Sequence, residues 1–289
     1  MRRAAILGCA SNGADYDTIP HAELLQCVAR RIVDKHLLHL IQMWLKVPVE
    51  ERDETGKKRL TGGKDNDRGT PQGGVVVSGL PVGACCASIS PLLANLYMNR
   101  MLKGWKQTKR GEQLQARMVS YADDFVILSR GHATEALGWT RGVLERMGLT
   151  LNEQKTSIRN ARQERFDFLG YTFGPHFSRR TGRQHMGCSP SKKSVNRIKE
   201  KVGEHLRPEN TTPWEEVRDQ LNQKLRGWKA YFGFGSPTTA YEVLDEHVED
   251  RVRHFMRRRH KVSSQGTRQF SMERIFGALG VFRLRGPLA

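Results

Sequence analysis

The sequence predicts an α+β protein in which a region of mixed strands and helices precedes a region that is helical throughout. Three observations support this. Two β-rich arms flank a short acidic centre within residues 118–128, a pattern typical of a hairpin. Helical periodicity recurs on both sides of that hairpin. After residue 187 the strand signals fade, and basic amphipathic helices follow one another towards the C-terminus.

Within the first region, apolar residues at helical spacing predict two helices between residues 20 and 45. Residues 1–14 lack such a pattern, so we expect an irregular start, and the charged stretch 49–68 predicts a loop or hairpin. Glycine and proline in residues 69–83 exclude a long helix, and Pro91 is therefore expected at the first position of the next helix. Residues 133–147 predict a helix closed by Gly148, followed by short strands at 149–151 and 166–173.

The helical region is expected to contain three helices, at about 192–205, 213–232 and 240–260. Trp228, Tyr231 and Phe232 share the apolar stripe of the second helix, which favours core packing over stacking on bases. The change in character places the domain boundary at 182–190. The predicted domains are therefore residues 1–182 and 183–289.

The charge balance points to a polyanionic partner. Lys and Arg number 48 against 30 Asp and Glu, a formal net charge of +18. Nucleic acid is the commonest partner of so basic a chain, and a basic protein without such a partner is the alternative. No apolar run approaches the ~20 residues of a membrane span, and the start lacks a secretory signal. Five cysteines without a C-x-x-C pair predict a reducing, cytoplasmic setting without zinc.

Two adjacent carboxylates, Asp123 and Asp124, lie at the tip of the predicted hairpin, and the flanking strands offer no cation to offset them. Mg²⁺ would do so, because it takes carboxylate oxygens together with substrate phosphates. Two such ions can activate a hydroxyl and stabilise a leaving pyrophosphate. Aspartate is also favoured in turns for conformational reasons, so the pair alone leaves both interpretations open.

Five motifs set this pair in a wider pattern. The motifs are GTPQGG at 69–74, SPLLANLYM at 90–98, YADD at 121–124, GLTLNEQKT at 148–156 and FDFLGY at 166–171. With these motifs in this order, the chain from about Tyr16 to its C-terminus resembles the reverse transcriptases encoded by bacterial group II introns.

The resemblance implies a right-hand polymerase palm followed by an all-α thumb and maturase domain. Asp123 and Asp124 match the catalytic carboxylates of the family, with Mg²⁺ as cofactor. Tyr16 matches the residue that screens the 2′-hydroxyl of the incoming nucleotide. Gln72 matches a contact to nucleotide and template, and Lys155 matches a lysine near the triphosphate.

The resemblance also assigns nucleic-acid contacts. The segment Phe168, Leu169, Gly170 and Tyr171 matches the hairpin that grips the primer end, although a buried strand with a bulge glycine would give the same pattern. The implied partners are group II intron RNA, a DNA primer or target, and dNTPs, and a homodimer is left open. The basic helices supply the expected RNA-binding residues Lys192, Lys193, Arg226, Arg257, Arg258 and Arg259, in line with phosphate contact.

The chain departs from the family at two places. Ser11 stands where the first of three catalytic aspartates is expected, and the fingers that precede it in relatives are expected to be missing. Residues 75–89 join two motifs that relatives connect more directly. This extra segment predicts that Gln72 is displaced from the active site. Three functions follow: an RNA-directed DNA polymerase, a maturase that binds RNA without polymerising, and an inactive remnant.

Overall fold

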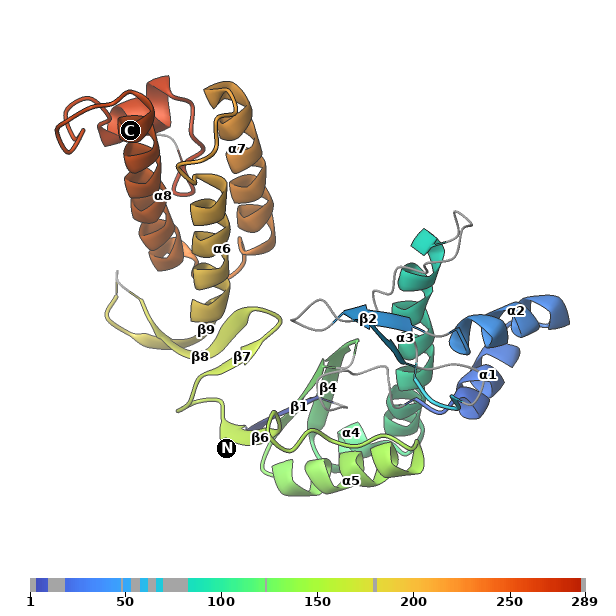
Figure 1. Cartoon of the computed structure of the whole chain (residues 1–289). Helices are drawn as coiled ribbons and strands as arrows, with labels where there is room; N and C mark the ends of the chain where they lie inside the picture. The colour runs from blue at the N-terminus through green and yellow to red at the C-terminus, as the bar shows by residue number, and fades with distance from the viewer. Residues whose placement is uncertain are drawn as a thin grey trace. The chain divides into compact units, whose positions relative to one another are not determined.

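Among the described residues the strands form three antiparallel sheets, and the helices pack against them or against one another. The computed structural model describes residues 4–9, 19–47, 49–52, 58–61, 66–69, 83–122, 124–178 and 181–286. Of residues 4–9, 49–52, 58–61 and 83–88 it describes the backbone. The chain divides into two compact units, Met1–Asn160 and Ala161–Ala289, here called the first and second units (Figure 1).

The first unit contains β1 (Ala4–Cys9), α1 (His21–Ala29), α2 (Lys35–Leu45), β2 (Val49–Arg52), β3 (Lys58–Thr61), α3 (Gly83–Gln107), α4 (Arg110–Gln113), β4 (Ala116–Tyr121), β5 (Asp124–Ser129), α5 (Ala133–Arg146) and β6 (Ser157–Asn160). The second contains β7 (Phe166–Phe168), β8 (Tyr171–Phe177), β9 (Gln184–Pro190), α6 (Lys192–His205), α7 (Trp214–Tyr231), α8 (Thr238–Arg259) and a π-helical turn, η1 (Arg274–Ala278).

A four-stranded sheet in the order β4-β5-β1-β6 organises the first unit. β4 and β5 form the hairpin predicted from the sequence. β1 lies between β5 and β6 and is antiparallel to both. The expectation of an irregular start is therefore wrong over Ala4–Cys9, because this short apolar run completes the centre of the sheet.

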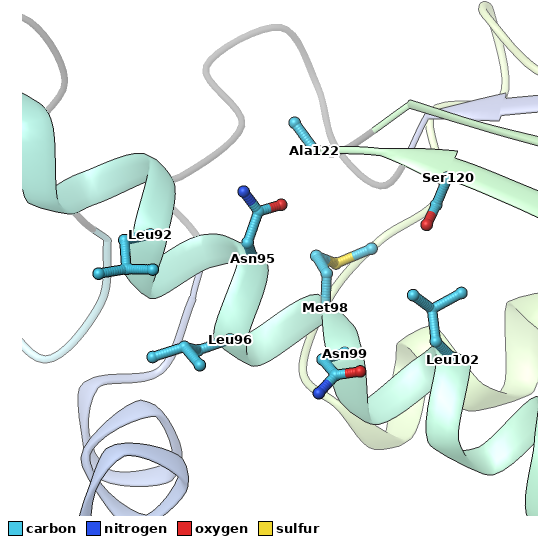
Figure 2. A pocket seen from close by; sticks show the side chains of 8 residues that line it. All are labelled: Leu92, Asn95, Leu96, Met98, Asn99, Leu102, Ser120 and Ala122. Atoms are coloured by element: carbon cyan, nitrogen blue, oxygen red, sulfur yellow. The ribbon is translucent and has the colours of Figure 1, made fainter. Parts of the chain in front are cut away.

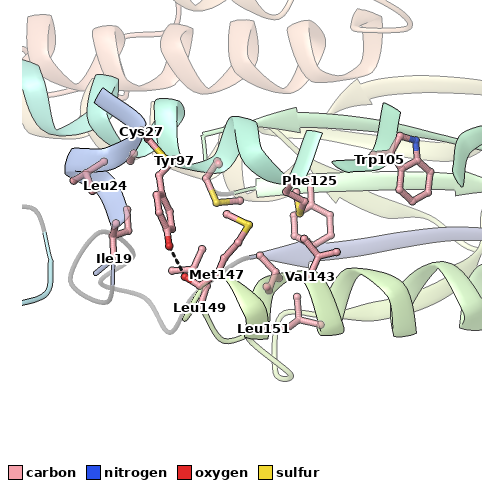
Figure 3. Packing of buried hydrophobic residues seen from close by; sticks show 14 of the residues in the cluster. Ile19, Leu24, Cys27, Tyr97, Trp105, Phe125, Val143, Met147, Leu149 and Leu151 are labelled. Carbon is pink, nitrogen blue, oxygen red and sulfur yellow. Dashed lines mark hydrogen bonds between the residues drawn. The ribbon is translucent and has the colours of Figure 1, made fainter. Parts of the chain in front are cut away.

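Helices cover one side of this sheet. Phe125 and Ile127 of β5 are buried in a core with side chains of α1, α3 and α5 (Figure 3). Tyr97 of α3 is fully buried, and its hydroxyl lies 2.5 Å from the carbonyl oxygen of Met147, so it joins α3 to the end of α5. Gly148 follows with a φ of 69°, which confirms that it closes this helix.

Several local expectations were wrong. α3 begins at Gly83, so Pro91 lies inside the helix rather than at its first position. No strand forms at 149–151, where Leu149 and Leu151 are instead buried in the core. β9 was not expected, because its polar sequence lacks a strand pattern, yet it pairs with β8 along its whole length.

The second unit is a three-helix core joined to the sheet β7-β8-β9. α6, α7 and α8 confirm the three predicted helices within two residues at each end. Leu221, Leu225, Leu244 and Val248 are fully buried between them. In the described part of the chain, no helix is long and apolar enough to cross a bilayer.

Candidate active site

The turn between β4 and β5 carries the acidic pair. Tyr121 and Asp124 are partners in the antiparallel register, so their side chains lie on the same face of the sheet. Ala122 takes a left-handed conformation with a φ of 51°, which reverses the chain within a short turn. Asp123 lies outside the described residues.

Among the described residues, the face that carries Asp124 is exposed in part. Phe125 and Ile127 point into the helical core, and the alternation along β5 directs Asp124 and Val126 to the opposite face. On that face Val126 is buried, whereas Tyr121 is 66% exposed and Val119 of β4 is 50% exposed. Asp124 is exposed as well. The carboxylate therefore stands at an accessible end of this face, with an aromatic neighbour.

The end of β1 lies beside this carboxylate. Cys9, the last residue of β1, is the register partner of Asp124 on the side away from Tyr121. Ser11 follows two residues later in the sequence, and it lies outside the described residues, as do Tyr16 and Gln72. The described part of β1 thus ends beside Asp124, two residues before Ser11, which stands where the resemblance to the family predicts an aspartate.

Asp124 fits a hard cation. Its carboxylate has no hydrogen-bond or ion-pair partner among the described residues, so its oxygens are available to a ligand. Carboxylate oxygen is the donor that Mg²⁺ prefers. Within the described ranges no three His, Cys, Asp or Glu side chains group closely enough to hold a metal.

A hollow of about 310 Å³ lies beside the turn, between α3 and β4 (Figure 2). Two carboxamides one helical turn apart, Asn95 and Asn99, line it from α3, and Ser120 and Ala122 line it from the hairpin. The sequence showed Asn95 only as part of a motif and gave no sign of Asn99 or Ser120, since the contact between α3 and β4 is a tertiary one.

Lys155 is exposed in the first unit, in the turn before β6. Its main-chain N–H donates to the carbonyl oxygen of Asn152 at 3.2 Å and to Oδ1 of that residue at 3.1 Å. Asn152 is buried, so it fixes the backbone of this turn. The lysine amine has no partner in the part of the chain that the structure describes, so it is available to an anion.

The segment Phe168–Tyr171 lies in the second unit, where it forms the tight turn of the β7-β8 hairpin. Leu169 and Gly170 have φ values of 51° and 78°, as a two-residue hairpin turn requires. The carbonyl of Gly170 accepts hydrogen bonds from the main-chain N–H of Ser191 and the hydroxyl of Ser194, at 2.8 and 2.9 Å. The turn is thereby fastened to the start of α6.

The basic residues predicted from the sequence to bind RNA differ in how exposed their side chains are. Lys192 and Lys193 are exposed at the start of α6, and Arg226 is exposed on α7. At the end of α8, Arg258 is exposed, whereas Arg257 is half-buried. Arg259 is exposed but donates to the carbonyl of Thr212 at 2.7 Å.

The three aromatic residues predicted to share one stripe, Trp228 and Tyr231 of α7 and Phe232 directly after it, divide between core and surface. Phe232 is buried and Trp228 is partly buried, as core packing predicts. Tyr231 is 58% exposed.

Residues 13–173 match the family model described as reverse transcriptase (RNA-dependent DNA polymerase). The chain belongs to the reverse transcriptase family. Residues 195–274 of this member of the family match the maturase-specific domain of group II introns. The mixed first region is thus the palm region of this family, with antiparallel sheets, and the helical region is the maturase domain.

Individual relatives are distant. Protein YkfC of Escherichia coli strain K12 is 30% identical over 187 residues, which cover 54% of this chain and 43% of YkfC. Among solved structures, telomerase from Candida albicans with a fragment of telomeric RNA gives a TM-score of 0.46 at 12% identity, over 100% of this chain and 50% of that one. Apo telomerase from Candida tropicalis gives 0.44 at 12% identity, over 95% and 44%. The chain thus spans about half the length of these proteins or less.

Proposed function

We propose that this member of the family is an active RNA-directed DNA polymerase of a group II intron, with a maturase domain that binds the intron RNA. The observation that supports polymerisation is the position of Asp124. Its carboxylate, which has no partner among the described residues, is exposed on the palm sheet between Tyr121 and the end of β1. A structural aspartate in a turn would instead be expected to accept hydrogen bonds from the turn itself.

In this proposal Asp123 and Asp124 would hold Mg²⁺, which supplies charge neutralisation at the phosphates and lowers the pKa of a bound hydroxyl. The exposed side chains of Val119 and Tyr121 give the primer end an apolar surface beside those carboxylates. Tyr16, Gln72 and Lys155 bind the incoming dNTP. The turn Phe168–Tyr171 holds the primer strand.

The maturase role has separate support. Arg226 and Arg258 are exposed cations within residues 195–274, which match the maturase-specific model, and Lys192 and Lys193 are exposed just before that range. Cations of this kind bind RNA phosphates by releasing counterions, so binding must weaken as salt rises. Intron RNA is the partner that we propose for this surface.

Primer extension by the full chain on an RNA template, with a DNA primer, dNTPs and Mg²⁺, tests the proposal. Asp124→Asn should lower incorporation by about a hundredfold or more, because an anionic metal ligand is lost. Glu112→Gln removes an exposed carboxylate on α4 and should leave incorporation unchanged.

The outcomes separate the functions. Incorporation that Asp124→Asn abolishes supports the polymerase. Absence of incorporation by the wild-type chain overturns it, and salt-sensitive binding to structured intron RNA then supports the maturase alone. A folded chain with neither property would be an inactive remnant.

A further inference from the structure

A hollow of about 190 Å³ lies in the second unit, away from every residue assigned a role above except Arg258. Its apolar part is formed by Leu206 and Pro208, which follow α6, and by Phe255 of α8. Phe255 and Leu206 are buried, so they form a floor, whereas Pro208 is exposed and forms an edge. The remaining lining is polar and comes from α8 alone.

The polar lining has an excess of positive charge. Arg251 and Arg258 line the hollow, and neither forms an ion pair with an acidic side chain of the described residues. The carboxylate in the lining, Asp250, already faces His254, with Oδ1 3.3 Å from Nδ1. The lining of the hollow therefore contains two guanidinium groups and one carboxylate, and that carboxylate already has a partner.

Arg251 is held in place and still has a free donor. Its Nη2 donates to the carbonyl of Gly203 on α6 at 3.3 Å, which directs the guanidinium across the gap between the two helices. Its Nε–H is buried and has no acceptor in the described part of the chain. A buried donor without an acceptor is costly, so an anion that supplies one would bind favourably.

We infer that this hollow binds one unpaired nucleotide of an RNA strand, with its phosphate on Arg251 and Arg258 and its ribose or base on the apolar floor. The combination of a cationic wall and an apolar floor suits a nucleotide better than a bare phosphate, which would gain nothing from Leu206 and Pro208. Single-stranded RNA is favoured over a duplex because an unpaired base can turn outward and pack on the apolar floor, which a paired base cannot reach. The inference rests on the RNA-binding part of the proposed function.

The test measures binding of a short fluorescent single-stranded RNA to the full chain by anisotropy at several salt concentrations. Arg258→Gln should weaken binding about tenfold and reduce the salt slope by about 0.7, the loss of one phosphate contact. Arg251→Gln should act in the same direction. Arg268→Gln removes the same charge from an exposed site of the same domain, outside the hollow, and should change the affinity less than twofold.

Two further arms identify the ligand. A blunt RNA duplex of the same sequence should bind with an affinity that Arg258→Gln barely alters, and millimolar inorganic phosphate should not displace the single strand. Equal losses for Arg258→Gln and Arg268→Gln, or for single strand and duplex, would overturn the inference while the RNA-binding function stands. Failure of the wild-type chain to bind any RNA would overturn both. Because Arg258 is exposed, its variant reports on binding even where Arg251→Gln fails to fold.

Discussion

Tyr171 and Tyr231 exchange hydrogen bonds between a hairpin and a helix. The hydroxyl of Tyr171 donates to the main-chain carbonyl of Tyr231 at 2.5 Å, and the hydroxyl of Tyr231 donates to the carbonyl of Leu169 at 3.1 Å. Their ring centroids lie 6.0 Å apart. The turn proposed to hold the primer is therefore tied to the end of α7 as well as to the start of α6.

Tyr231→Phe keeps the ring and deletes one of these bonds. We expect the free energy of unfolding to fall by about 1 kcal/mol, the usual net value of one hydrogen bond. Urea unfolding of the full chain measures it. Tyr121→Phe is the matched control, because the Tyr121 hydroxyl is exposed and has no partner among the described residues. Equal stability of the two variants would contradict the assigned bond.

Gly170→Ala should be among the most damaging small substitutions in the second unit. Gly170 has a φ of 78°, and an added Cβ would lie 2.9 Å from Oγ of Ser194 and 3.1 Å from the Phe232 ring. Left-handed strain alone costs roughly 1–2 kcal/mol. Gly182→Ala isolates that strain, since its φ is 65° and no atom lies within 4 Å of the added carbon. Thermal unfolding should show the larger loss for Gly170→Ala, and equal losses would disprove the crowding.

The hairpin turn that contains Gly170 shows which parts of the structure the sequence could predict. The family resemblance implied a hairpin at 168–171, whereas the local pattern predicted a single strand over 166–173, which is wrong because the chain turns at Leu169 and Gly170. The periodicity located α6, α7 and α8. The partners that hold the turn, Ser194 and Tyr231, lie 24 and 62 residues from the atoms they bind. No local pattern reports a contact at such separation.

The same limit explains the errors in the first unit. β1 is a short apolar run without alternation, so it resembles an irregular segment until its partners are known. Pro91 is a strong helix-start signal, but here α3 continues through it, which local propensity disfavours. At the candidate site, the motif predicted the position of Asp124, whereas the exposed face and the adjoining end of β1 follow from sheet order.

Asp245→Ala should destabilise the second unit strongly. Asp245 is 1% exposed, and its carboxylate accepts from the main-chain N–H groups of Leu284 and Arg285, at 2.8 and 3.2 Å. Loss of this acceptor leaves buried donors unpaired, at a cost of about 3 kcal/mol. Asp219→Ala removes an exposed carboxylate of α7 and should leave the denaturation midpoint unchanged. A midpoint for Asp245→Ala close to wild type would show that the C-terminal segment is not anchored there.

Stability should fall in mild acid because of His247. Burial lowers the pKa of its imidazole below the ordinary value of 6.5, and the side chain lies 3.3 Å from the carbonyl of Lys199. The folded state therefore resists protonation. This contribution to stability is present above pH 6.5 and is lost as the pH falls through the lowered value.

Denaturation midpoints measured from about pH 7.5 to about pH 5 would report this effect, because that range spans the ordinary pKa of histidine and the values below it. His247→Gln should reduce the fall in stability over this range, because it removes the titrating group. His260→Gln, exposed at the end of α8, should leave the fall as in the wild-type chain. Identical pH profiles for His247→Gln and wild type would refute the assignment.

Ser11→Asp should raise incorporation if the chain polymerises. Cys9 is the register partner of Asp124, and position 11 follows two residues later, where the family carries its first catalytic aspartate. A third carboxylate would strengthen metal binding, so the gain should be largest at low Mg²⁺. Ser11→Asn matches the size without the charge and should give no gain. A gain with both variants would point to a cause other than metal binding.

The sheet order β4-β5-β1-β6 also has a consequence for biosynthesis. β1 precedes its partners in the sequence, which are Asp124–Ser129 and Ser157–Asn160. During synthesis β1 must therefore wait for its first partner until residue 129 has left the ribosome and for its second until residue 160 has, several seconds or more at ordinary elongation rates. During that interval the apolar strand is open to other chains, so the four-stranded sheet is vulnerable to mispairing for longer than its compact final order suggests.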